Sequence, residues 1–195
     1  MIYIISLIIS YFLGSIPFGL IIAKLFNKGD IRKVGSGNIG ATNVMRVGGL
    51  RLAGLVWVLD MLKAVVAVLI GRYIGGEILA VWCGFMAIVG HCFPVWLKWH
   101  GGKGVSCLFG VLLAINPLLF IICGIEWLIV ALGTGYSSAG ALIAFIVMPI
   151  LGFAMNTEIG IGFFVITLLC LWRHRENLKR LISGNESKVE WKWKK

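Results

Sequence analysis

The stretch GVSCLFGVLLAINPLLFIICGIEWLIVALG, residues 104–133, decides how many times the chain crosses a membrane. It is almost wholly apolar, and about 20 apolar residues are enough for one spanning helix. As one helix it would be longer than a bilayer core requires. Pro117 lacks an amide hydrogen and disfavours helical geometry at Asn116, so we expect a break between these residues. The stretch then provides two short spans, 104–115 and 117–133.

The composition of the whole chain is typical of a membrane protein. Of its 195 residues, 59% are hydrophobic and 13% are charged, whereas about a quarter of a soluble domain is charged. Apolar runs predict seven transmembrane helices, at about 2–25, 52–71, 77–97, 104–115, 117–133, 137–154 and 158–172. We therefore expect an all-α integral membrane protein with a single seven-span domain over residues 1–195.

The positions of Lys and Arg predict the orientation, because these residues concentrate in cytoplasmic loops. They gather in residues 24–51, in residues 98–103 and in the tail from Arg173 onward. Seven spans place all three segments in the cytoplasm, with the N-terminus outside and the C-terminus cytoplasmic, whereas six spans would put the basic tail outside. The net charge of +10 then reflects this bias and attraction to membrane lipids. Basic and aromatic residues do not alternate as in a nucleic-acid site, and EWKWKK at 190–195 is a predicted interfacial anchor.

A few polar residues fall inside the predicted spans. Asp60 and Lys63 are three residues apart on one helical face, and we expect them to neutralise each other within the bundle. Glu126 has no obvious partner in the sequence. The five cysteines show no C-x-x-C pairing, so we expect free, buried thiols rather than a metal site or disulfides.

The first polar cluster is the loop 28–51, which contains GSGNIGATN at residues 35–43. Its glycines match the dinucleotide fingerprint G-x-G-x-x-G, but that motif requires a preceding strand and a βαβ unit, and here membrane helices flank the loop. The glycines Gly35, Gly37 and Gly40 allow backbone amides to approach an anion closely. Candidate side-chain donors to phosphate are Ser36, Asn38, Thr42, Asn43 and Arg46. The alternative is a surface loop with helix-capping residues.

The second cluster joins His91 to the loop HGGKG at residues 100–104. It is not a nucleotide P-loop, because Leu97 stands where that motif requires its first glycine and Gly104 stands where it requires a hydroxyl. A lysine between glycines, here Lys103, can still contact an anion as a point charge. The alternative is a tight turn with one interfacial lysine and a packed His91.

Two further groups of polar residues have weaker interpretations. Ser138 belongs to a Ser/Thr-containing group at 134–138, which is also typical of helix–helix contacts in membranes. The basic tail resembles a lipid-contacting segment, but Asn177 and Glu186 within it are unexpected for that role.

Together these residues resemble the bacterial acyl-phosphate-dependent glycerol-3-phosphate acyltransferases of the PlsY type. The first family motif resembles GSIPFG at 14–19 with D-x-R-x-x-GSGN-x-GATN at 30–43 and Arg46. The second resembles H-x-FP at 91–94 with GGKGV at 101–105, and the third resembles RHREN-x-x-RL-x-x-G-x-E at 173–186. His100, Ser106-Cys107 and Ala64 differ from the usual family residues, and none of these changes removes a residue expected to be essential.

The resemblance implies an enzyme of the bacterial inner membrane with its active site toward the cytoplasm. It would transfer an acyl group from long-chain acyl phosphate to the 1-hydroxyl of sn-glycerol 3-phosphate, without a cofactor or metal. A soluble acyl-phosphate synthase is a possible partner. The expected catalytic residues are Ser36, Arg46 and Lys103. The expected substrate-binding residues are Gly35, Gly37, Asn38, Gly40, Thr42, Asn43, His91, Gly101, Gly102, Gly104, Ser138, Asn177 and Glu186.

The expected chemistry is direct attack by the glycerol hydroxyl, because acyl phosphate is already activated. The sequence has no Ser-His-Asp order, and no Asp stands five residues after His91, His100 or His174. A transporter of a small phosphorylated anion is the competing class, since polar clusters near spans would suit it. A structural or lipid-binding membrane protein is a third possibility.

Overall fold

The computed structural model describes residues 1–189, and this part of the chain is helical, without strands. The helices are α1 (Ile2–Gly14), α2 (Phe18–Leu25), α3 (Ala41–Cys92), α4 (Val105–Ile115), α5 (Pro117–Thr134), α6 (Ser137–Met155), α7 (Thr157–Arg173) and α8 (Arg175–Ile182). Short 3₁₀ helices cover Ile31–Lys33 and Val95–Leu97. The all-α prediction is confirmed, whereas the predicted anchor at 190–195 lies outside the described residues.

The first predicted span is not one continuous helix. It breaks between α1 and α2, where Pro17 disfavours helical geometry at Ile16. The carbonyl of Ser15 at the break accepts a hydrogen bond from Nε1 of Trp96 at 3.0 Å, and the carbonyl of Ile16 accepts one from Nζ of Lys63 at 2.8 Å. Together, α1 and α2 are long and apolar enough for one crossing.

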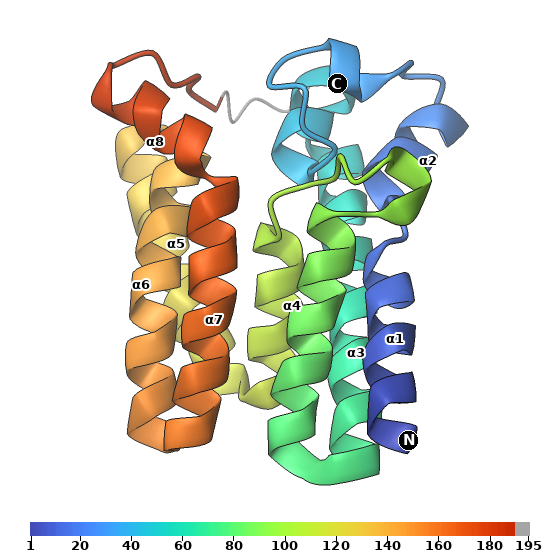
Figure 1. The fold of residues 1–195 in the computed structure, drawn as a ribbon. Coiled ribbons are helices and arrows are strands. Elements are labelled where there is room, and N and C mark those ends of the chain that lie inside the picture. Colours follow the sequence, from blue (N-terminus) through green and yellow to red (C-terminus); the bar gives the residue numbers. More distant parts are fainter. Residues whose placement is uncertain (190–195) are drawn as a thin grey trace.

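The helix α3 contains both the second and the third predicted spans. It begins at Ala41, so residues 41–48 of the predicted loop 28–51 are helical. The non-helical Gly49 (φ 80°, ψ 177°) separates this turn of helix from the arm that begins close to the predicted residue 52. The helix α3 reverses direction at Gly75 and Gly76, at the lower end of Figure 1, where Gly76 has a φ of 76° that favours glycine. The second arm ends at Cys92 rather than at residue 97, because Pro94 disfavours helical geometry at the preceding residue.

The predicted break at Asn116 and Pro117 is confirmed. Pro117 is the first residue of α5, and Oδ1 of Asn116 accepts a hydrogen bond from the amide of Leu118 at 2.9 Å. Asn156 caps α7 in the same way, with 2.7 Å to the amide of Glu158. These Asn caps fix the turns before α5 and α7, which lie at the lower end of the bundle with the turn at Gly75 and Gly76 (Figure 1).

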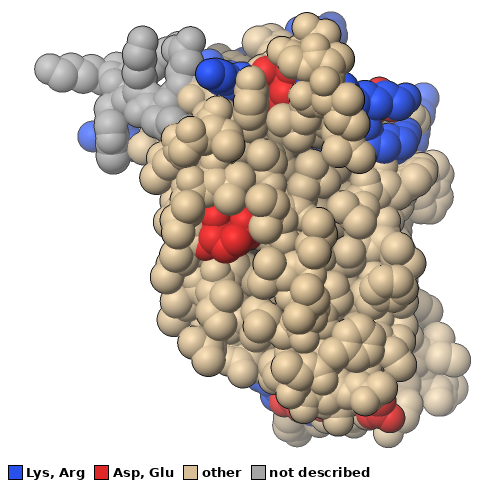
Figure 2. Space-filling view, turned by 90° about the vertical axis from the view of Figure 1, so that its left-hand side faces the viewer, with Lys and Arg blue, Asp and Glu red and all other residues tan. Residues whose placement is uncertain are grey.

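The helices are suited to a lipid environment. In the described residues, four helical segments are long and apolar enough to cross a membrane, and α7 with α8, bent by 59°, would be a fifth. One of the four segments contains both arms of α3, and α4 is apolar but short. Figure 2 shows a face that is uncharged between its two ends, apart from one acidic patch at mid-height.

The polar clusters meet at one end of the bundle. Figure 1 shows the loop before α3, the loop before α4 and helix α8 together at the upper end, opposite the N-terminus. The largest buried core lies below them and is built from both arms of α3 with α4, α5, α6 and α7, including Phe145 and Phe163. This core holds the helix ends that form the candidate site.

Candidate active site

Three helix N-termini meet at one cavity of about 750 Å³. Its wall includes residues at the start of α3 (Ala41–Asn43), of α4 (Val105 and Ser106) and of α6 (Ser137 and Ser138). Each N-terminus carries amide groups without helical partners and the positive end of a helix dipole, so each favours an anion. The side chains of Arg46, Lys103 and Arg180 add positive charge to the same wall.

Asn43 holds the glycine-rich loop together. Its Nδ2 donates to the carbonyls of Ile31, Val34 and Asn38 at 2.8, 3.1 and 2.8 Å, and its Oδ1 accepts from the amide of Ser36 at 3.0 Å. The residue is only 1% exposed. Asn43 also lines the cavity, and its expected contact with substrate stays a prediction beside its role in shaping the loop.

The glycines of this loop take conformations that favour glycine. Gly35 and Gly37 have φ angles of 61° and 68°. A side chain at Gly35 would also meet Oδ1 of Asn43 at 2.4 Å. Gly35 and Gly40 line the cavity, whereas Gly37 does not. The loop therefore presents backbone to the cavity, as a phosphate-binding loop requires.

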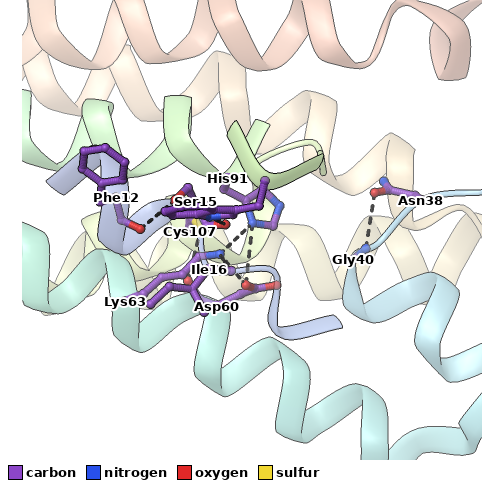
Figure 3. Close-up of polar contacts among 10 residues, drawn as sticks. Phe12, Ser15, Ile16, Asn38, Gly40, Asp60, Lys63, His91 and Cys107 are labelled. Carbon is purple, nitrogen blue, oxygen red and sulfur yellow. Dashed lines mark hydrogen bonds and ion pairs between the residues drawn. The ribbon is translucent and has the colours of Figure 1, made fainter. Parts of the chain in front are cut away.

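The remaining residues predicted in this loop face the cavity. Ser36, Asn38, Thr42 and Arg46 all line it. Oδ1 of Asn38 accepts from the amide of Gly40 at 3.3 Å (Figure 3), and Oγ1 of Thr42 lies 3.3 Å from Oγ of Ser137, which links the starts of α3 and α6.

In the second loop, at residues 100–104, some residues line the cavity and others pack against neighbouring segments. Lys103 and Gly104 line the cavity, and Gly104, with φ 89°, precedes α4. Gly101 and Gly102 do not line it. Their carbonyls accept hydrogen bonds from Arg173 at 2.8–3.0 Å, and a side chain at Gly102 would meet Nε2 of His91 at 2.0 Å. Gly101 and Gly102 therefore allow the loop to pack closely, and their expected role in substrate binding stays a prediction.

His91 lines the cavity and also belongs to a buried polar network (Figure 3). Nζ of Lys63 lies 2.6 Å from Oδ1 of Asp60 and 3.1 Å from Nδ1 of His91. The predicted Asp60–Lys63 pair is confirmed, with both side chains at most 3% exposed. Since the ring of His91 also packs on Gly102, the network supports the loop that carries Lys103.

Glu186 connects the Ser/Thr-containing group at residues 134–138 to the basic tail. Its carboxylate accepts hydrogen bonds from Oγ of Ser138 at 2.8 Å, from Nδ2 of Asn177 at 2.6 Å and from Nε of Arg180 at 2.7 Å. Nζ of Lys103 donates to Oδ1 of Asn177. Ser138, Asn177 and Glu186, which lie far apart in the sequence, thus meet at the cavity with Lys103.

This cluster changes the pKa of two of its members. Burial alone would raise the pKa of the Glu186 carboxyl, but hydrogen bonds from Asn177, Ser138 and Arg180 bring it below its usual value. Burial and the nearby charge of Arg180 lower the pKa of Lys103 to about 8, against the opposing effect of Glu186. Lys103 therefore titrates close to neutral pH.

Four further residues at the site were not predicted from the sequence. His174 and Arg180 line the cavity, as does Ser137, and Arg173 holds the loop at Gly101 and Gly102. His174 is 3% exposed and stands three residues before Asn177, where α7 ends and α8 begins. The quoted motif RHREN contains both His174 and Arg173. Their helical spacing to Asn177 was the available signal.

The cavity continues from the polar end into an apolar groove between α3 and α5. The helix α4 packs against both of these helices and forms the floor, whereas direct contact between α3 and α5 is marginal. The groove is lined by Met45, Leu50, Ala53, Gly54, Trp57, Val105, Phe109, Phe120, Ile121, Gly124, Ile125 and Leu128. Ile121 and Ile125 are about half exposed, so the groove opens sideways toward lipid.

A cationic cradle at the membrane surface, joined to an apolar groove that opens sideways, defines a membrane protein that handles an anionic lipid or its precursor. A family model for glycerol-3-phosphate acyltransferase matches residues 4–184. The chain belongs to this glycerol-3-phosphate acyltransferase family and is thus a multi-pass membrane acyltransferase.

Individual relatives and solved structures agree with this assignment. The glycerol-3-phosphate acyltransferase of Rhodopseudomonas palustris (strain BisB5) is 47% identical, over 96% of each chain. That of Rhizobium etli is 45% identical, over 93% of this chain and 89% of the relative. Two crystal structures of PlsY, an integral membrane glycerol 3-phosphate acyltransferase, are also similar. The glycerol 3-phosphate form is 36% identical with a TM-score of 0.91 over 96% of each chain. The lysophosphatidic acid form is 35% identical with a TM-score of 0.90, over 97% of this chain and 96% of that one.

Proposed function

We propose that the protein transfers an acyl group from long-chain acyl phosphate to the 1-hydroxyl of sn-glycerol 3-phosphate. The products are 1-acyl-glycerol 3-phosphate (lysophosphatidic acid) and inorganic phosphate, as in the first step of phospholipid biosynthesis. The observation that carries the proposal is the continuity between the cationic cradle and the apolar groove. Both substrates carry phosphate and one carries a long chain, so the reaction needs both features in contact.

The proposed reaction needs no covalent enzyme intermediate, because acyl phosphate is a mixed anhydride. The glycerol oxygen attacks the acyl carbonyl carbon, the bond between that carbon and the phosphate oxygen breaks, and the leaving phosphate takes the hydroxyl proton. Ser36 orients the reacting hydroxyl. Arg46 and Lys103 stabilise the negative charge that develops on the carbonyl oxygen and the phosphate.

The other site residues hold the substrates and each other. Asn38, Thr42 and the amides of Gly35 and Gly40 contact phosphate, and Asn177 positions substrate. Glu186 fixes Asn177 and Ser138 through the hydrogen bonds described above. Asn43 and the glycines at 101 and 102 also shape the two loops. Neither a cofactor nor a metal takes part in the proposed reaction.

We propose seven membrane crossings, with the N-terminus outside and the C-terminus and active site in the cytoplasm of a bacterial inner membrane. Counting α1 with α2, each arm of α3, and α4 to α7 gives this number. The basic loops and α8 at one end of the bundle support the orientation. Membrane lipids would surround the bundle. A soluble acyl-phosphate synthase would deliver acyl phosphate at this cytoplasmic end.

Reconstituted vesicles distinguish this enzyme from a transporter of phosphorylated anions. With labelled glycerol 3-phosphate and palmitoyl phosphate supplied together, we expect labelled lysophosphatidic acid in the membrane. Without acyl donor, we expect no label inside the vesicles. Uptake of glycerol 3-phosphate without acylation would contradict the proposal, and neither activity would favour a structural or lipid-binding protein.

Variants of the glycine-rich loop test its role in the same assay. Ser36→Ala and Arg46→Ala should each lower the rate by about a hundredfold or more while preserving the thermal unfolding profile. Lys28→Ala, an exposed residue outside the cavity, is the control and should retain the wild-type rate. Wild-type rates in both loop variants would remove the role proposed for this loop.

A further inference from the structure

The apolar groove ends at three aromatic rings. On each of the three helices, the described cavity-lining residue farthest from the polar end is aromatic. These residues are Trp57 on α3, Phe109 on α4 and Phe120 on α5. Each of the three helices that form the groove therefore contributes an aromatic side chain at the same depth.

The three rings contact one another and join the walls of the groove. The ring centroids of Trp57 and Phe109 are 6.3 Å apart, those of Phe109 and Phe120 are 6.0 Å apart, and those of Trp57 and Phe120 are 6.5 Å apart. These are normal distances for interacting aromatic rings. Since α3 and α5 scarcely touch elsewhere, the Trp57–Phe120 contact closes the groove at this depth.

We infer that the rings of Trp57, Phe109 and Phe120 form a stop that limits the length of the bound acyl chain. This inference rests on the proposed function. A chain that runs from the cradle along the groove buries its methylenes until it reaches the rings. Each methylene that is buried favours binding by about fourfold, and a methylene beyond the stop gains nothing from the groove.

Substitutions at the stop should change the preferred acyl-chain length in either direction. Trp57→Ala and Phe120→Ala remove a ring from opposite walls and lengthen the groove. Each should raise the ratio of kcat/KM for stearoyl phosphate over myristoyl phosphate by about tenfold. Phe120→Trp enlarges one ring and should lower that ratio. Two variants on different helices keep the test valid if one of them fails to fold.

The matched control is Trp82→Ala. Trp82 lies on the other arm of α3, is half-buried against Phe85 and does not line the cavity. Its removal should leave the chain-length ratio unchanged. An unchanged ratio in folded, active Trp57→Ala and Phe120→Ala variants would overturn the inference.

Binding of lysophosphatidic acids tests the stop independently of whether acyl phosphate is the acyl donor. Thermal stabilisation of the wild-type protein and both Ala variants can be measured with myristoyl and stearoyl lysophosphatidic acids. The variants should gain stabilisation selectively from the stearoyl form, even if acyl phosphate were not the donor. Equal responses in wild type and variants would overturn the stop, whereas a failure of acyl phosphate alone would count only against the proposed reaction.

Discussion

Nδ2 of Asn177 donates a hydrogen bond of 2.6 Å to Oε1 of Glu186. This bond fixes the orientation of the Asn177 amide, so that its oxygen faces Lys103 and accepts a hydrogen bond from Nζ. Glu186 is held in turn by Ser138 and Arg180. Glu186, which follows α8, therefore positions Asn177 beside the cationic side chain of Lys103.

Glu186→Gln should lower kcat/KM for acyl transfer by about a hundredfold, because the amide of Asn177 loses its charged acceptor and its fixed orientation. Steady-state rates at varied glycerol 3-phosphate give the value. Glu176→Gln removes an exposed carboxylate on α8, the helix that carries Asn177, and is the control. Equal rates for both variants would mean that Glu186 does not organise the site.

The rate should depend on pH through Lys103, whose pKa is lowered to about 8. Lysine is charged below its pKa, so kcat/KM should be highest below pH 8 and fall as pH rises through that value. In Lys103→Arg the decline should move to higher pH, because arginine stays charged. Lys98→Arg, an exposed lysine outside the cavity, should leave the profile unchanged. An unchanged profile in Lys103→Arg would contradict the role of its charge.

Asn43 and Asn38 should respond differently to truncation, although they belong to one loop. Asn43→Ala removes four hydrogen bonds from a buried position and should destabilise the protein by about 2–3 kcal/mol while raising KM for glycerol 3-phosphate. Asn38→Ala should reduce activity with little change in unfolding temperature. Thermal unfolding in detergent together with KM separates the two effects, and equal stability of both variants would contradict the account of Asn43.

Breaking the Asp60–Lys63 pair should be costly, because it leaves a buried charge without its partner. Lys63→Met should destabilise the protein by about 3–5 kcal/mol, and the double variant Asp60→Asn, Lys63→Met should recover part of that loss. Glu77→Gln breaks an exposed pair with Arg72 and should cost less than about 1 kcal/mol. Additive effects of the two single substitutions in a double-mutant cycle would contradict coupling between Asp60 and Lys63.

Much of this fold follows from local rules. The break at Asn116-Pro117 and the pairing of Asp60 with Lys63 depend on neighbouring residues, and both predictions are confirmed. The break after Gly14, the helical segment that begins at Ala41 and the helix end at Cys92, in place of the predicted residue 97, were not predicted. Apolar periodicity marks a membrane span but not the end of the helix that contains it, so prolines and capping residues decide those positions.

The sequence predicts which kinds of residue form the site, but not how they are arranged. The phosphate-binding loops were visible as glycines with Ser, Asn, Arg and Lys nearby. The commitment of Asn43 to its own loop and the packing of Gly102 on His91 depend on contacts between segments far apart in the sequence. The meeting of three helix N-termini depends on the same tertiary packing, as does the aromatic stop. No single-segment pattern encodes these relationships.

The most direct test of the proposed reaction compares two acyl donors with the purified protein in lipid. Palmitoyl phosphate and palmitoyl-CoA are each supplied with glycerol 3-phosphate, and lysophosphatidic acid and phosphate are quantified together. We expect lysophosphatidic acid from palmitoyl phosphate, with one phosphate released for each acyl group transferred. Transfer from palmitoyl-CoA alone, or from neither donor, would contradict the account.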